Sequence, residues 1–125
     1  MNDRELLELA ARAAGIKARW FKVNQWRRLD GCRLHTGQKD VFGTHHRKPW
    51  NPLTDDGDAL RLAVRLNMDI RYESYDSGVA VIVGGAWDGA PEAVHEIFER
   101  DGPRATRRAI VRAAAEIGKS MGGGE

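Results

Sequence analysis

The hairpin pattern between residues 68 and 83 restricts the fold of this chain more than any other feature. Apolar residues alternate with charged ones from Met68 to Glu73, which is typical of a strand with one buried face. A turn-forming segment, residues 76–78, follows. The next run, residues 79–83, is apolar on both faces, as in strands that are central in a sheet or covered by helices. The pattern predicts an antiparallel pair of strands.

Three segments carry the apolar periodicity of a helix, and each begins with a capping signal. In the first segment, Glu5 follows Asn2 at capping-box spacing, and Gly15 supplies the left-handed residue that ends a helix. The second segment is capped by Thr54 or Asp55. Its expected buried face consists of Ala59, Leu60, Ala63 and Val64.

The third helix pattern begins beside Gly102, the expected cap, with Pro103 in the first turn, where a missing N–H group costs nothing. The preceding residues, 91–100, fit either a short helix or a third strand, and both alternatives stay open.

Together the patterns predict an α+β fold, in which an antiparallel β-sheet is packed by three α-helices. We expect a single domain over residues 1–121 and a disordered glycine-rich tail over residues 122–125.

The region between the first two helix patterns has weaker signals. The dipeptide Asp30-Gly31 favours a tight turn, so residues 25–29 and 32–35 are expected to pair as two strands around it. Glycines and polar residues from Gly37 to Gly43 favour a loop.

The net charge of +2 conceals an uneven distribution of charged residues. Residues 17–50 contain nine lysine or arginine residues and only two aspartates, a formal charge of +7. The rest of the chain therefore carries −5. A basic stretch of this kind indicates an acidic partner.

Several classes of protein are disfavoured. No apolar run approaches the roughly 18 residues that a membrane span needs, and the charged N-terminus does not resemble a signal peptide. The single cysteine, Cys32, has no internal disulfide partner, and a small buried apolar role is its simplest interpretation. We therefore expect a protein of the cytoplasm that does not associate with a membrane.

Three motifs occur in order along the chain: ELLELAA at residues 5–11, WNPLTDDGDALRLA at residues 50–63 and ATRRAIVRAAAEIG at residues 105–118. In this order they resemble the small bacteriophage and prophage proteins grouped as the phage ABA-sandwich domain. The resemblance implies a phage or prophage origin, hence a host-cell cytoplasm, and an α/β sandwich fold. It implies no activity, and it does not extend to residues 17–48 or 84–100.

Two clusters contain residue types that could bind a metal in a small metal-dependent or nucleotide-processing enzyme. One consists of Asp55, Asp56 and Asp58, which helix capping and the helix dipole already explain. The other consists of Cys32, His35, His45 and His46, whose spacing matches no zinc pattern. No nucleophile–histidine–acid arrangement is readable, so no catalytic residue, metal ligand or cofactor is assigned.

The basic stretch also contains aromatic residues, a combination that suits phosphate neutralisation and base stacking. Together with the phage origin that the resemblance implies, this combination predicts a non-catalytic accessory protein whose partner is nucleic acid, a nucleotide or an acidic host protein. A structural role through self-association is a further alternative. The expected contact residues are Trp26, Arg27, Arg28, His45, His46, Arg47, Lys48 and Trp50.

Overall fold

The computed structural model describes residues 1–85 and 93–121, and its chain divides into two compact units. Residues 1–17 and 51–125 form the helix–sheet unit, and residues 18–50 form the ribbon unit. Helices and antiparallel strands are both present, so the predicted α+β class is confirmed. The glycine-rich tail expected at residues 122–125 lies outside the described residues.

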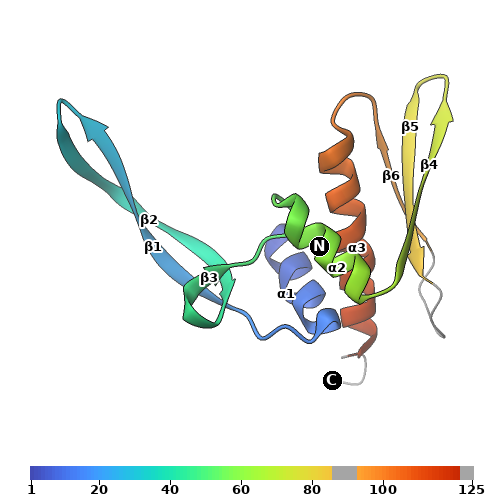
Figure 1. Ribbon diagram of the computed structural model, residues 1–125, viewed down its shortest axis with the longest axis horizontal. Coiled ribbons are helices and arrows are strands. Elements are labelled where there is room, and N and C mark those ends of the chain that lie inside the picture. The colour runs from blue at the N-terminus through green and yellow to red at the C-terminus, as the bar shows by residue number, and fades with distance from the viewer. Residues whose placement is uncertain (86–92, 122–125) are drawn as a thin grey trace. The chain divides into compact units, whose positions relative to one another are not determined.

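The helix–sheet unit contains helices α1 (Asp3–Ala14), α2 (Asp56–Arg65) and α3 (Gly102–Met121) and strands β4 (Met68–Tyr75), β5 (Gly78–Gly85) and β6 (Val94–Phe98). The strands form an antiparallel sheet in the order β4-β5-β6. Helix α3 packs against β5 and β6 and also contacts α1 and α2 (Figure 1). The predicted hairpin is confirmed, and the segment left open before α3 is a third strand.

The sheet turns an apolar face toward α3. Val81, Val83 and Val94 are buried on it. At the same face the Tyr72 hydroxyl lies 2.8 Å from the Thr106 hydroxyl of α3. Strand β5 is the central strand of this sheet, one of the two positions that its doubly apolar sequence predicted.

The helix ends follow the capping signals, with one correction. Asn2 accepts a hydrogen bond from the Glu5 backbone N–H group at 2.9 Å, and Gly15 ends α1 in the left-handed conformation. Asp55 accepts from the Asp58 N–H group at 2.8 Å. The expected Gly102 cap is wrong, because the Asp101 side chain accepts from the Arg104 N–H group at 3.0 Å and a glycine has no side chain to do so.

The expected buried face of α2 is also only partly right. Ala59 and Ala63 are buried, but Leu60 and Val64 are 62% and 68% exposed. Leu62, two per cent exposed, completes the packed stripe. Two overlapping apolar stripes are present in this helix, and periodicity alone does not choose between them.

The ribbon unit contains two long strands, β1 (Arg19–Leu29) and β2 (Cys32–Thr44). A short 3-10 helix, η1 (His45–Arg47), leads to β3 (Lys48–Pro49), which pairs with the end of β2. Figure 1 shows β1 and β2 as an extended twisted hairpin. At its turn Asp30 and Gly31 both have positive φ angles, of 50° and 78°, as a two-residue hairpin turn of this kind requires.

The hairpin is confirmed, but the loop expected from Gly37 to Gly43 is wrong. These residues continue β2 and pair with β1 as far as Arg19. Gly37 has a φ of 129° at an irregularity in the ladder, which is a common position for glycine in a strand. The glycine signal therefore marks a bulge and not the end of the strand.

No helix among the described residues combines the length and the hydropathy of a membrane-crossing segment.

Close packing between α1 and α3 yields a stability prediction at Gly118. A Cβ atom added there would overlap the backbone carbonyl oxygen of Leu9 in α1. Gly118→Ala should therefore destabilise the fold by about 1–3 kcal/mol, although alanine is normally the better helix former. Urea unfolding followed by circular dichroism measures this change. Ser120→Ala, at an exposed position of the same helix, should be neutral or slightly stabilising. A Gly118→Ala variant as stable as the natural chain would contradict the packing.

Candidate functional site

The register of β1 and β2 gives the ribbon two faces of different chemistry. Side chains at alternate positions share a face, and cross-strand partners lie on the same face. We call one side the polar face. Its cross-strand pairs in the outer part of the ribbon are Asn24 with Gln38, Trp26 with His35, and Arg28 with Arg33.

A bulge keeps this face continuous along both strands. Gln25 pairs with Gly37 and Trp26 pairs with His35, which leaves Thr36 of β2 without a cross-strand partner. Shifting a strand by one residue moves its side chains to the opposite face. The extra residue therefore places Gln38 and His35 on the same side of the ribbon.

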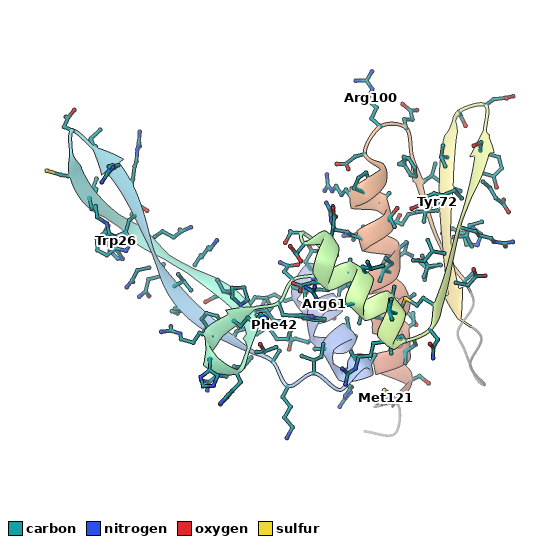
Figure 2. All side chains as sticks on the ribbon, viewed as in Figure 1. Trp26, Phe42, Arg61, Tyr72, Arg100 and Met121 are labelled. Atoms are coloured by element: carbon teal, nitrogen blue, oxygen red, sulfur yellow. The ribbon has the colours of Figure 1, made fainter. Side chains whose placement is uncertain are left out.

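Trp26 is the central aromatic residue of the polar face, and Figure 2 shows it in the outer part of the hairpin. Its side chain is 50% exposed. The Arg33 guanidinium carbon lies 4.7 Å from the centroid of the Trp26 ring, within cation–π range. The His35 ring meets the same indole edge-on at a centroid distance of 5.0 Å. Arg33 and His35 thus contact the Trp26 ring on part of its surface, and the rest of the ring is accessible to solvent.

Polar contacts continue from Trp26 toward the base of the ribbon. The Asn24 side-chain oxygen accepts from the Gln38 amide at 2.9 Å and lies 3.3 Å from His35 Nε2. Further along, Lys22 Nζ forms an ion pair with Asp40 at 3.2 Å. These contacts connect side chains across the two strands and restrict their conformations, although the side chains remain exposed.

The opposite side, which we call the apolar face, carries Phe21, Val23, Leu29, Leu34 and Val41. Leu34 is 52% exposed, nearly the same as Trp26. Arg27 projects from this face because it pairs with Leu34. The aliphatic side chains of the two strands therefore all lie on this face, together with Phe21 and Arg27, and none lies on the polar face.

Trp50 lies in an aromatic cluster at the base of the ribbon. Its ring centroid is 6.0 Å from that of Phe42, which in turn lies 4.9 Å from Trp20. The Trp50 N–H group of the backbone donates to the Phe42 carbonyl at 2.9 Å. Trp50 is 7% exposed, so little of its indole is available for a ligand to stack on.

The loop residues His45 to Lys48 are exposed, and Arg47 connects them to β1. Arg47 Nη2 donates to the Lys22 carbonyl at 2.8 Å, and its guanidinium lies 5.2 Å from the Phe21 ring centroid. The His45 and His46 rings meet edge-on at 4.1 Å. These contacts anchor the loop at the base of the ribbon.

The predicted contact residues therefore do not form one cluster. Trp26 and Arg28 share the polar face, whereas Arg27 lies on the apolar face. The loop from His45 to Lys48 lies at the base of the ribbon, next to the pair of Trp20 with Phe42. Trp26 is six residues further along β1, or about 20 Å from that pair.

Sequence analysis missed the cross-strand partners, Arg33, His35 and Gln38, as members of the polar face. Counting outward from the Asp30-Gly31 turn pairs Arg28 with Arg33 and Trp26 with His35. That signal was therefore present in the sequence. Gln38 could not be assigned in this way, because the bulge shifts the register before it.

The candidate metal ligands are not brought together. Cys32 pairs with Leu29 on the apolar face, while His35 lies on the polar face. Cys32 is exposed, so the expected buried role of this residue is wrong. Asp55 caps α2, Asp56 pairs with Arg107 at 2.7 Å, and Asp58 pairs with Arg61 at 2.7 Å. Within residues 1–85 and 93–121, no three side chains of the types that bind metals form a group.

Charge is divided along the same boundary as the structure. The ribbon unit has eight lysine or arginine residues against two aspartates, a formal charge of +6. The helix–sheet unit, which includes the undescribed segments, then carries −4. Residues 5–11, 50–63 and 105–118, which resemble the phage domain, fall on α1, on α2 with its lead-in, and on α3.

No family model matches the chain, and neither the curated proteins nor the solved structures contain a match.

The two tryptophans of the ribbon should respond differently to substitution. Trp50→Ala removes a buried ring and should destabilise the base of the ribbon by about 3–5 kcal/mol. Trp26→Ala, at a half-exposed position, should change stability by about 1 kcal/mol or less. Hydrogen exchange of the β1 and β2 amides measures both effects. Equal loss of amide protection in the two variants would contradict the assignment of Trp50 to packing and Trp26 to the surface.

Proposed function

We propose that the ribbon unit binds nucleic acid and that this chain is a non-catalytic accessory protein of a phage or prophage. The observation that carries the proposal is the polar face, where Trp26 stands beside Arg28 and Arg33 in a unit of formal charge +6. The phage origin rests on the sequence resemblance alone.

Electrostatics favours a polyanion as the partner. Lysine and arginine side chains that neutralise phosphates release condensed counterions, and this release supplies most of the non-specific affinity for nucleic acid. The ribbon unit combines the required charge with an extended exposed shape of its own (Figure 1).

The chemistry of the polar face favours nucleic acid over an acidic host protein. Its outer pairs supply an indole, two guanidinium groups, an imidazole and two amides, and no aliphatic side chain. Protein interfaces usually have an apolar centre, which the polar face lacks. Aromatic, amide and guanidinium groups are those that stack on bases and contact their edges.

The other functions remain alternatives without a comparable observation. The residues considered for an enzyme are separated or engaged in capping and ion pairs, as described above. Self-association would use the apolar face, and light scattering of the purified chain tests it directly. A monomer at micromolar concentration would count against that alternative.

Fluorescence anisotropy with labelled oligonucleotides tests the proposal. The logarithm of the association constant should fall linearly with the logarithm of salt concentration, by about 0.7–0.9 per phosphate contact. The triple variant Arg27→Ala, Arg28→Ala, Arg33→Ala should bind about 100-fold more weakly at 0.1 M salt and show a shallower salt dependence.

A charge-matched control separates the ribbon from general electrostatics. Arg65→Ala, Arg71→Ala, Arg100→Ala removes three exposed arginines from the helix–sheet unit and gives the same net charge as the ribbon variant. This control should bind nearly as well as the natural chain. Equal losses in both triple variants, or no binding of nucleic acid at low salt, would overturn the proposal.

A further inference from the structure

We propose that the polar face binds single-stranded nucleic acid, with a base stacked on Trp26 and a phosphate held between Arg28 and Arg33. The inference rests on the proposed function, because it names the form of nucleic acid and the residues that select it.

The exposed indole of Trp26 is the first reason. Half of this side chain remains in solvent on an extended strand, although burying an aromatic ring is favourable. Arg33 and His35 contact the ring at 4.7 Å and 5.0 Å and restrict its orientation. A base that stacks on the open part of the ring therefore meets a surface that is already positioned, and such stacking contributes roughly ten- to hundred-fold in affinity.

The cross-strand arginine pair is the second reason. Arg28 and Arg33 face each other directly, so their Cβ atoms lie about 5 Å apart, and like charges in this position repel. No ion pair in the described part of the chain involves either residue. A phosphate between them would accept hydrogen bonds from both guanidinium groups and convert the repulsion into attraction.

The spacing of these two features fits one nucleotide. Trp26 and Arg28 are alternate residues of β1, about 7 Å apart along the strand and on the same face. A nucleotide whose base stacks on Trp26 can therefore place an adjacent phosphate near the arginine pair. On the other side of Trp26, the Asn24 and Gln38 amides provide donors and acceptors for base edges.

A single strand meets these requirements better than a duplex. The flat faces of the bases are covered by their neighbours in a duplex, and an indole reaches them only when stacking is broken. In a single strand the bases can turn outward and stack on aromatic side chains with little regard to sequence. The polar face therefore selects strands whose bases are accessible.

Anisotropy titrations of single-stranded DNA, single-stranded RNA and the corresponding DNA duplex test this inference at one low salt concentration. The natural chain should bind at least one single strand about ten-fold or more tightly than the duplex. Trp26→Ala should weaken single-strand binding by about ten-fold or more, while Trp26→Phe, which retains an aromatic face, should weaken it much less. Leu34→Ala, equally exposed but on the apolar face, should leave binding unchanged.

The salt dependence separates stacking from charge. Trp26→Ala should lower affinity without changing the slope, because stacking releases no counterions. Arg28→Ala, Arg33→Ala should reduce the slope by about 0.7, the value for the one phosphate that the two guanidinium groups share on a single strand. Hydrogen exchange of the ribbon amides verifies that each variant is folded. If Trp26→Ala does not fold, the comparison of Trp26→Phe with the natural chain still tests the stacking contact.

Failure of this inference is distinguishable from failure of the proposed function. Salt-sensitive binding that is equal for duplex and single strand, or unaffected by Trp26→Ala, would overturn the single-strand assignment and leave nucleic-acid binding intact. An equal loss in Leu34→Ala would also overturn it, because the contact would then not be confined to the polar face. Absence of binding to all three probes would overturn both.

Discussion

The register of the β1–β2 hairpin is the constraint on which the candidate site depends. The positive φ angles of Asp30 and Gly31 permit a two-residue turn, and this turn fixes Arg28 opposite Arg33 and Trp26 opposite His35. The bulge then inserts one residue into β2 and shifts the remaining pairs. Without the insertion Lys22 would face Lys39, whereas in the structure it forms an ion pair with Asp40.

The ribbon unit depends on this pairing because few of its side chains are buried. Phe42 and Trp50 are buried at the base, while side chains further out remain mostly in solvent. An isolated two-stranded hairpin is marginally stable in water, so cross-strand contacts and any bound partner contribute a large share of its order. The helix–sheet unit is instead stabilised by buried packing, because small residues of α3 such as Gly118 let helix α1 approach closely. Acidic residues are in excess there, and basic residues in the ribbon unit.

Local signals predicted much of the fold. The caps at Asn2 and Asp55 and the turn at Asp30-Gly31 depend on neighbouring residues only, so the sequence reveals them. The errors depend on contacts distant in the chain. The exposed Leu60 belongs to an alternative stripe of α2, and residues after Gly37 form a strand because β1 offers backbone partners. For the candidate site, composition indicated the region on which the proposal rests, but the division into two faces required the register.

Nucleic acid should contact the ribbon on the polar face alone, and a nuclear magnetic resonance titration measures this most directly. Addition of a short single strand to the isotopically labelled chain should shift the indole resonance of Trp26 and the side-chain amide resonances of Asn24 and Gln38. Methyl resonances of Val23 and Leu34 on the apolar face should change little. Shifts concentrated in the helix–sheet unit, or on the apolar face of the ribbon, would contradict the central claim.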